Sequence, residues 1–277
     1  MKIIADSGAT KTDWLIYSGN YTTITRTSGI NPYHQSSDDI EKIIKEQVQF
    51  EIPYNTNIDE IYFYGAGCTK DKKNIVKDAL TKIFPKSIIH IESDLLGAAR
   101  ALLGNKEGIA CILGTGSNSC LYNGCDIITN IPPLGYILGD EGSGAVLGKK
   151  LVADCLKHQL PDYICNKFFQ EFKLTPEIII NKIYSEPQAN RFLSSLAPFL
   201  GENKNLPEIH NFLLDSFSEF FKRNIEFYNR KDLPVSFVGS VAFYCTEELT
   251  EVANKYHYSI GKIIQTPIKE LIGYHLK

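Results

Sequence analysis

The same polar turn between two apolar strands occurs twice in this sequence, once near the N-terminus and once in the middle. The first copy spans 3–17 and turns at 6–12 (DSGATKT), and the second spans 108–122 and turns at 113–118 (LGTGSN). Glycine allows close backbone approach with unusual dihedral angles, and turn amides and Thr or Ser hydroxyls can donate to phosphate oxygens. The repeat therefore predicts two related halves, each with a strand–turn–strand unit suited to phosphate.

A third segment ends another apolar strand in a turn of small residues. Residues 233–243 (LPVSFVGSVAF) have the pattern of a buried strand, a turn at Gly239 and Ser240, and the beginning of a helix. This geometry suits a backbone that supports a purine ring. The three turns together indicate a nucleotide site more specifically than any one of them.

The three turns resemble the first phosphate, second phosphate and adenosine motifs of the actin, Hsp70 and sugar-kinase superfamily. Ser93 and Asp94 at an expected helix start, with 135–144 (GYILGDEGSG), narrow the resemblance to N-acetylglucosamine kinases of the BadF/BadG/BcrA/BcrD type. The resemblance covers essentially the whole chain. It implies an α/β chain with a two-lobed actin-like ATPase (ribonuclease H-like) fold, in which a duplicated mixed sheet is flanked by helices.

The hydrophobic pattern predicts elements in the same order in both halves. In the first half we expect strands near 2–7, 12–17, 20–27, 59–65 and 88–91, and helices near 36–49, 71–84 and 93–103. In the second half we expect strands near 108–113, 118–123, 126–131, 235–239 and 259–264, a helix near 240–255 and a terminal helix after Pro267.

A long helical insertion is expected from about 143 to 230, with breaks at Pro161, Pro176, Pro187, Gly201 and Pro207. Its last helix, 207–230, carries an aromatic stripe that we interpret as core. Because the terminal helix of the family packs on the first lobe, the resemblance assigns 1–108 plus 267–277 to the N-terminal lobe and 109–266 to the C-terminal lobe.

Composition limits the classes of partner. The 277 residues carry a net charge of −3 and 43% hydrophobic residues, with no basic stripe for nucleic acid and no apolar run near the ~18 residues of a membrane span. No charged leader with an apolar segment is visible, so a cytoplasmic location is expected. The seven cysteines form no CxxC pair, which favours buried thiols over disulfides or zinc.

The resemblance gives the phosphate residues their roles in phosphoryl transfer from ATP. Asp6 is implied to hold Mg²⁺, commonly through water, although an Asx-type turn would also account for it. The cofactor-binding residues implied on the first turn are Gly8, Ala9, Thr10 and Lys11. Those implied on the second turn and the adenosine motif are Thr115, Gly116, Ser117, Gly239 and Ser240.

Asp94 is implied to be the catalytic base that accepts the proton of the sugar hydroxyl. Local sequence alone favours helix capping, since Ser and Asp are preferred at helix starts whether or not a site exists. The sugar-binding residues implied by the resemblance are Asn31, Gly67, Gly139, Asp140 and Glu141. The chain departs from the family at 132–136 (PPLGY), where Gly-Trp-Gly is usual, and at Gly239-Ser240, where Gly-Gly is usual.

The implied function is ATP- and Mg²⁺-dependent phosphorylation of an amino sugar, most simply N-acetylglucosamine on its 6-hydroxyl, with N-acetylmuramic acid as a close variant. One alternative is the ATPase activator of a 2-hydroxyacyl-CoA dehydratase or benzoyl-CoA reductase, in which Cys111 or Cys125 would have to bind an iron–sulfur cluster. Another is a non-catalytic sugar sensor. The sugar, the hydroxyl, the nucleotide preference and the oligomeric state, a homodimer included, are left open by the sequence.

Overall fold

The computed structural model describes residues 1–19, 21–52 and 57–275, and its internal contacts divide the chain into two compact units. The first unit contains Met1–Lys106, Asn123–Ile127 and Thr266–Lys277, and the second contains Glu107–Tyr122 and Ile128–Gln265. The lobe boundaries inferred from sequence lie near these. That the two parts act as separate domains stays a prediction.

The first unit is built on a five-stranded mixed sheet with the order β3-β2-β1-β4-β5. Its strands are β1 (Lys2–Ser7), β2 (Lys11–Ser18), β3 (Tyr21–Ser28), β4 (Glu60–Gly65) and β5 (Ile88–Ser93). β1 and β2 are antiparallel, as are β2 and β3, whereas β4 runs parallel to both β1 and β5. The sequence pattern predicted this meander followed by two parallel strands; residue 20, its expected start for β3, lies outside the described residues.

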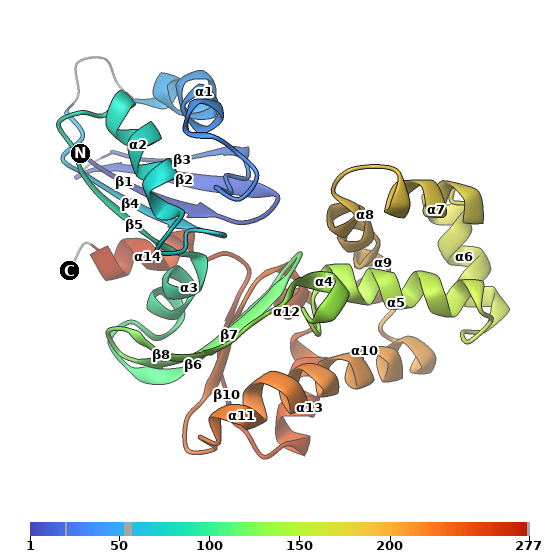
Figure 1. The fold of residues 1–277 in the computed structure, drawn as a ribbon. Coiled ribbons are helices and arrows are strands. Elements are labelled where there is room, and N and C mark those ends of the chain that lie inside the picture. The colour runs from blue at the N-terminus through green and yellow to red at the C-terminus, as the bar shows by residue number, and fades with distance from the viewer. Residues whose placement is uncertain (20, 53–56, 276–277) are drawn as a thin grey trace. The chain divides into compact units, whose positions relative to one another are not determined.

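Helices cover both faces of the first sheet (Figure 1). They are α1 (Ser37–Gln47), α2 (Lys73–Ile83), α3 (Asp94–Leu103) and α14 (Ile268–His275), with a short 3₁₀ turn at Gln49–Glu51. Side chains alternate along β4, so Ile61 and Phe63 join the core with α1 and α2. Tyr62 and Tyr64 point the other way and contact His275 of α14, which fixes the C-terminal helix on the first unit.

The parallel strands of the first sheet end in one row. Ser7 of β1 pairs with Gly65 of β4, and Gly65 pairs with Ser93 of β5. The segments that follow these three residues therefore emerge at the same edge of the sheet, where ligands bind in open α/β sheets. That edge carries the first polar turn, the loop after β4 and the first residue of α3.

The second unit repeats the topology with the order β10-β9-β6-β7-β8. Its strands are β6 (Glu107–Leu113), β7 (Ser117–Asn123), β8 (Ile127–Ile131), β9 (Val235–Val238) and β10 (Ile260–Ile264). β9 is parallel to both β6 and β10, as β4 is to β1 and β5. The predicted duplicated mixed sheet flanked by helices is confirmed.

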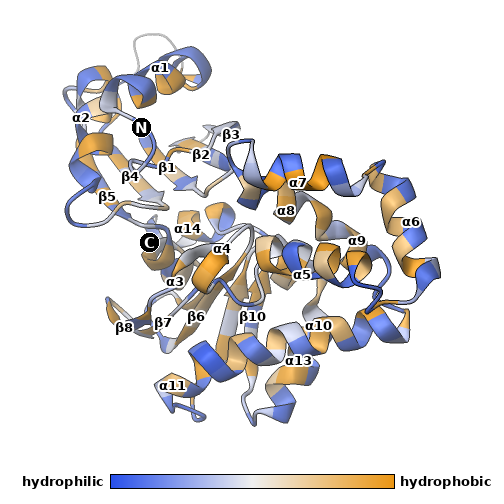
Figure 2. Cartoon of the chain, turned by 45° about the vertical axis from the view of Figure 1, so that its right-hand side comes forward, coloured by the Kyte–Doolittle hydropathy of each residue, from blue (hydrophilic) through white to orange (hydrophobic). Residues whose placement is uncertain are grey.

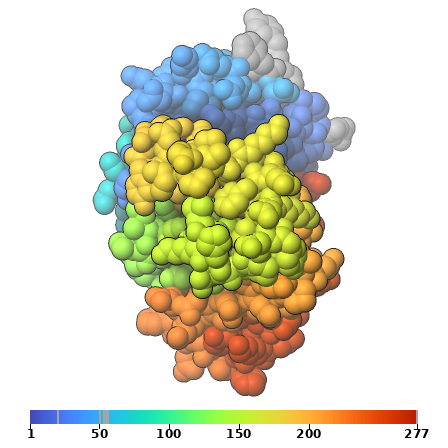
Figure 3. Space-filling model, turned by 90° about the vertical axis from the view of Figure 1, so that its right-hand side faces the viewer, coloured from blue at the N-terminus to red at the C-terminus, as the bar shows by residue number. Residues whose placement is uncertain are grey.

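Most helices of the second unit belong to the predicted insertion. They are α5 (Gly144–Leu156), α6 (Asp162–Phe172), α7 (Pro176–Tyr184), α8 (Ala189–Leu196), α9 (Pro198–Glu202), α10 (Pro207–Phe220) and α11 (Glu226–Tyr228), whereas the short α4 (Gly135–Leu138) precedes the insertion. The helices from α5 to α8 run from yellow-green to yellow over the face shown in Figure 3. Phe212, Phe217, Phe220 and Phe221 are buried, so this part of the aromatic stripe is core, as predicted. Phe227, the last aromatic residue of the predicted stripe, is 65% exposed, so the prediction was wrong there.

Two glycines let α5 and α8 pack with their backbones close together. A Cβ atom on Gly148 would lie 1.9 Å from the carbonyl oxygen of Leu193, and one on Gly144 would lie 2.5 Å from the Ser194 Oγ. At Gly148 the clash is with backbone, so a methyl group there requires the partner helix to move, whereas at Gly144 it would displace the Ser194 side chain. The separation of α5 and α8 is therefore set by the absence of side chains at these two positions.

Three expected helix boundaries were wrong. The helix expected over 207–230 changes at Phe221–Ile225 to a π-helical turn, labelled η2, before α11. The helix expected over 240–255 is divided at Cys245 into α12 (Ser240–Tyr244) and α13 (Thr246–Lys255). Gly201, expected to be a break, lies inside α9, because a glycine weakens a helix by only about 1 kcal/mol.

All seven cysteines are free thiols, and every one except Cys125 is buried. The expectation of buried thiols is thus confirmed for six of them. Within 1–19, 21–52 and 57–275, no helix combines the length and apolar character needed to cross a bilayer.

Candidate active site

The first polar turn is closed by backbone bonds and supported from below by hydroxyls. The Gly8 amide donates to the Lys11 carbonyl (3.0 Å), and Ser7 Oγ lies 2.7 Å from Thr12 Oγ1. Gly29 packs under the turn, since its Cβ would lie 2.5 Å from the Gly8 carbonyl oxygen. Sequence reasoning missed the support that Gly29 gives to this turn, because Gly29 belongs to a separate segment of the chain.

The unusual dihedral angles expected at Gly8 are absent, so that part of the prediction was wrong. Gly8 is not among the glycines with positive φ, and the atom nearest to its Cβ position would be the Lys11 carbonyl oxygen at 3.9 Å. Glycine at this position leaves open space beside the turn amides, whereas the tight steric requirement falls on Gly29.

Asp94 is the first residue of α3 and lies next to the helix cap. The cap is Ser93, whose Oγ accepts from the Leu96 amide (3.2 Å), while the Leu95 amide donates to Asp94 Oδ1 (2.8 Å). Burial raises the pKa of Asp94 to about 6, although hydrogen bonds from the backbone amides of Leu95 and of Asp94 itself oppose the rise. Because Ser93 supplies the cap, capping does not explain the acid at position 94.

Asp6, near the end of β1, lies close enough to Asp94 for their charges to interact. Burial raises the pKa of Asp6 to about 7, the negative charges of Asp94 and Asp13 add to the rise, and Lys11 opposes it. A carboxylate in this setting gains stability from a nearby cation. Within the described part of the chain, no hydrogen bond or ion pair reaches the Asp6 carboxylate.

One carboxylate with free oxygens is a donor set that fits Mg²⁺, which keeps several waters and takes one or two carboxylates from a protein. The described residues contain no group of three or more His, Cys, Asp or Glu side chains that could hold a metal ion. A site at Asp6 would therefore bind the ion largely through water, as the resemblance implies.

Lys11 forms an ion pair on the first turn. Its Nζ lies 3.3 Å from Oδ2 of Asp13, a buried residue on β2 that also pairs with Arg26 Nε at 2.6 Å. Asp13 was missed by sequence reasoning; the only signal was its position opposite Asp6 in the hairpin. The Lys11 side chain remains half exposed, and its predicted role in holding phosphate stays a prediction.

Asn31 and Gly67, predicted to bind sugar, are in contact. Asn31 Oδ1 accepts from the Tyr33 amide (2.9 Å), and a Cβ on Gly67, whose φ is +76°, would lie 2.3 Å from that oxygen. The Asn31 side-chain amide donates to nothing in the described part of the chain, so it can serve a ligand. Asp94 also contributes to the raised pKa of Cys68, which places Asp94 beside this loop.

The second polar turn is supported by the beginning of α5. Gly114 donates to the Gly116 carbonyl (3.0 Å), while the amides of Gly144 and Ala145 donate to the Gly114 and Thr115 carbonyls at 2.8 and 3.1 Å. The Asp140 carboxylate lies over the turn, because its Oδ2 would be 3.1 Å from a Cβ on Gly116. The structure thus brings together the second phosphate turn and part of the 139–141 loop.

Burial raises the pKa of Asp140 to about 6, an effect opposed by a hydrogen bond from the Ser117 amide and assisted by the charge of Glu141. Asp140 has a φ of +53°, and its amide donates to the Pro133 carbonyl at 2.8 Å. A Cβ on Gly139 would lie 2.2 Å from the same carbonyl oxygen. The two prolines that depart from the family pattern thus precede a loop that Pro133 itself supports.

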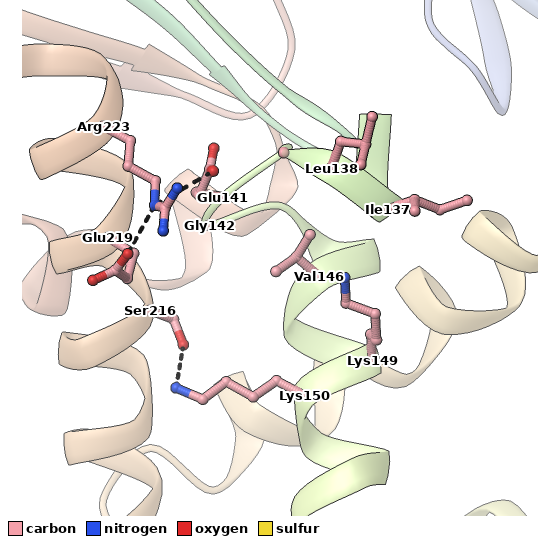
Figure 4. A pocket seen from close by; sticks show the side chains of 11 residues that line it. Ile137, Leu138, Glu141, Gly142, Val146, Lys149, Lys150, Ser216, Glu219 and Arg223 are labelled. Carbon is pink, nitrogen blue, oxygen red and sulfur yellow. Dashed lines mark hydrogen bonds and ion pairs between the residues drawn. The ribbon is translucent and has the colours of Figure 1, made fainter. Parts of the chain in front are cut away.

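Glu141 is the predicted site residue that faces away from the phosphate turn. Its carboxylate accepts from Asn224 Nδ2 (3.4 Å) and lies 3.7 Å from Arg223 Nε, on η2. With Arg223, Glu141 borders a cavity of about 340 Å³ between α4, α5 and α10 (Figure 4). Ile137 and Leu138 of α4 are exposed at its margin, and α4 carries the hydrophobic colour in Figure 2.

Gly239 joins the adenosine motif to the second phosphate turn. Its φ is +127°, and a Cβ there would lie 2.2 Å from the Leu113 carbonyl oxygen, so only glycine fits without strain. Ser240, next in the chain, borders a cavity of about 550 Å³. The cavity lining includes Leu147 of α5, Ser194 of α8, Leu200 and Gly201 of α9, and Tyr244 of α12.

The activator alternative finds no support at its two cysteines. Cys111 is completely buried within β6, where burial raises its pKa well above the ordinary value, and Cys125 lies alone on the exposed turn after β7. A cluster at a dimer interface needs accessible thiolates.

Comparison with models of known protein families finds no match. A curated N-acetyl-D-glucosamine kinase from Dictyostelium discoideum is 27% identical over 168 residues, covering 55% of this chain and 53% of the relative, so the match spans about half of that protein's length. A solved structure from Chromobacterium violaceum, a proposed N-acetylglucosamine kinase, shares the fold with a TM-score of 0.67 at 15% identity, covering 99% of this chain and 98% of that one.

A second solved structure is much more similar. It is a proposed N-acetylglucosamine kinase from Porphyromonas gingivalis, 46% identical, with a TM-score of 0.96 over 99% of this chain and 98% of that chain. Such identity over nearly the full length of both chains shows common descent and not only a common fold. The chain belongs to the N-acetylglucosamine kinase-like family.

Proposed function

We propose that the protein is an ATP- and Mg²⁺-dependent kinase that phosphorylates the 6-hydroxyl of N-acetylglucosamine, with N-acetylmuramic acid as a close variant. The observation that carries the proposal is the position of Asp94: a partly buried acid, not needed as a cap, beside Asp6 at the edge where the parallel strands end. The names of the relatives at 46% and 27% identity support an N-acetylglucosamine substrate.

Asp94 acts as the general base for the attacking hydroxyl. With a pKa of about 6 it is ionised at neutral pH, yet basic enough to accept a proton as the oxygen attacks phosphorus. The Leu95 amide holds Oδ1, so the carboxylate keeps a fixed orientation while Oδ2 accepts the proton. General-base catalysis of this kind contributes about 10²–10⁴ in rate.

ATP is held through its phosphates and its adenosine group. Asp6 would hold Mg²⁺, which neutralises phosphate charge during phosphoryl transfer. Thr10 and the amides of Gly8 and Ala9 bind phosphate from the first unit, and Thr115, Gly116 and Ser117 do so from the second. The cavity of about 550 Å³ beside Ser240 takes the adenosine group, and its volume falls in the usual range of ligand pockets, roughly 300–1,000 Å³.

Each unit carries residues that we assign to sugar binding. The free side-chain amide of Asn31 donates to one hydroxyl, and Gly67 leaves the backbone open beside it. On the second unit, Gly139 and Asp140 bind further hydroxyls or the acetamido group, while Glu141 keeps the loop in place. The location is expected to be the cytoplasm, where ATP is available.

A coupled assay of ADP release across a sugar panel tests the proposal. N-acetylglucosamine should stimulate ADP release far more than glucose or N-acetylmannosamine. N-acetylmuramic acid, the close variant, should be included in the panel. Phosphorus NMR should place the product phosphate on the 6-oxygen. Asp6→Ala and Thr115→Val should each weaken ATP-dependent turnover. Sugar-independent ATP hydrolysis, or ATP binding without turnover on any sugar, would overturn the kinase assignment.

A further inference from the structure

The 139–142 loop directs two neighbouring acids to opposite sides. Asp140 lies over the second phosphate turn, where it approaches Gly116 and accepts from the Ser117 amide. Glu141 points to the other side of the loop, toward η2 at the end of α10 (Figure 4). The left-handed backbone of Asp140, φ +53°, accompanies this reversal. Because the two acids are adjacent, a contact that holds Glu141 also restrains Asp140, in addition to the contacts that Asp140 makes with the Pro133 carbonyl and the Ser117 amide.

Two consecutive residues of η2 make that contact. Asn224 Nδ2 donates to Glu141 Oε2 (3.4 Å) and to the Phe220 carbonyl (3.2 Å). Arg223 Nε lies 3.7 Å from Glu141 Oε1 and 2.9 Å from Glu219 Oε2, as the dashed lines in Figure 4 show. Glu141 is thus held by a neutral donor from inside the unit and by a cation from the surface.

The π-helical turn explains how two consecutive residues, Arg223 and Asn224, can both contact the Glu141 carboxylate. Its i→i+5 bonding places more residues in each turn than an α-helix has, so consecutive side chains diverge by a smaller angle. Isolated π turns within α-helices occur frequently at functional sites. Here the turn brings Arg223 and Asn224 to the same carboxylate.

The burial of Asn224 is not explained by packing alone. It is 5% exposed, among the buried apolar residues Phe220, Phe221 and Ile225. An amide in such surroundings destabilises the fold unless its hydrogen bonds are made, and an aliphatic residue would pack there without that penalty. The hydrogen bond from Asn224 to Glu141 accounts for a polar residue at this buried position, because it holds the 139–142 loop.

We propose that Asn224 and Arg223 are positioning residues for the sugar loop, holding Glu141 so that Gly139 and Asp140 face the substrate. This inference rests on the proposed function of the loop. Neither residue touches substrate; they act through Glu141. Loss of the contact should weaken sugar binding and leave ATP binding and the phosphoryl-transfer step largely intact.

Steady-state kinetics of Asn224→Leu and Asn224→Asp test the proposal. Leucine removes the donor at similar volume, and aspartate faces Glu141 with a like charge. Each should raise KM for N-acetylglucosamine about tenfold or more, as expected for losing one hydrogen bond to a charged group, with kcat and KM for ATP nearly unchanged. Lys222→Ala, an exposed neighbour on the same turn, is the matched control and should change nothing.

A rescue experiment separates positioning from a loss of packing. In the double variant Glu141→Gln with Asn224→Asp, the glutamine amide can donate to the new carboxylate, so KM for the sugar should return to within about threefold of wild type, consistent with double-mutant coupling of neighbours. No recovery would show that Glu141 itself binds the sugar as a carboxylate. Equal damage to both KM values would show that Asn224 only stabilises the fold.

Hydrogen exchange without any substrate distinguishes this inference from the proposed function. Amides of 134–143 should exchange faster in Asn224→Leu than in wild type or Lys222→Ala, because the loop loses its anchor. If wild type phosphorylates no sugar, the proposed function fails, while faster exchange still supports the anchoring contact. Unchanged exchange in Asn224→Leu overturns the inference whatever the wild-type activity.

Discussion

The two polar turns have similar sequences but are held in different ways. The first turn, after β1, packs on Gly29 and lies beside three acids, Asp6, Asp13 and Asp94. The second, after β6, lies against the start of α5 and the backbone of Gly239, and one acid, Asp140, lies over it. The repeated motif thus specifies a turn geometry, and the surroundings make the two turns differ. The acids beside the first turn form a negatively charged site suited to a metal ion, whereas the second turn is bordered mainly by backbone.

The largest effect on turnover is expected from Asp94, the acid beside the first turn, in contrast to Asp140, the acid over the second turn. Asp94→Asn should lower kcat by at least ~100-fold, since an amide cannot accept the hydroxyl proton, and should leave ATP binding and the unfolding temperature close to wild type. Asp140→Asn should act mainly on KM for the sugar. Turnover in Asp94→Asn above about a tenth of wild type would remove Asp94 from the role of base.

The next largest effect is a difference in stability between alanine substitutions at Gly239 and at Gly8. Gly239→Ala should destabilise the protein by about 2 kcal/mol or more, because it combines a φ of +127° with a clash against the Leu113 carbonyl. Gly8→Ala, which meets no atom within 3.4 Å, should leave the free energy of unfolding nearly unchanged while raising KM for ATP. Urea denaturation of both variants measures the difference, and equal losses would contradict it.

The pH dependence of kcat should follow the ionisation of Asp94, beside the first turn, and not that of Asp140, over the second turn. A base works only when ionised, so kcat at saturating Mg²⁺, ATP and sugar should fall as pH falls through about 6 and be about tenfold lower at pH 5. Asp140 also has a pKa of about 6, so the profile of Asp140→Asn decides between them. If that variant loses the inflection, the titrating group is Asp140.

The smallest expected effect concerns stability without metal. The folded state raises the pKa of Asp6 from 3.8 to about 7, so the protonated form favours folding and this contribution is lost as pH rises through 7. Asp6→Asn should therefore be more stable than wild type at pH 8 in EDTA, by on the order of 1 kcal/mol, with no difference near pH 4. A variant less stable than wild type at pH 8 would show that the Asp6 carboxylate supports the fold.

Local pattern was enough to predict much of this molecule. Both strand–turn–strand units, the parallel strands after them and the beginning of α3 at Ser93 and Asp94 follow from nearby apolar periodicity and turn residues. The family resemblance then predicted which polar residues belong to a site, and those roles stay predictions. The acids Asp6 and Asp94 are near one another because parallel strands end at a common edge, which topology alone implies.

What could not be predicted depends on contacts between distant segments. The steric role of Gly29 under Gly8, the pairing of Asp13 with Lys11, and the direction of Glu141 are set by neighbours that no local window contains. The π-helical turn after Phe220 has the same apolar spacing as a continuing helix, so periodicity does not reveal it.

The close packing of α5 on α8 has a consequence for the width of the larger cavity. Ser194 of α8 and Leu147 of α5 face the cavity of about 550 Å³, yet the distance between the two helices is fixed by Gly144 and Gly148, which do not line it. The width of this cavity can therefore change, by evolution or by design, through residues that do not line it. A single methyl group added at position 148 would push α8 away and widen the cavity without replacing any side chain in its lining.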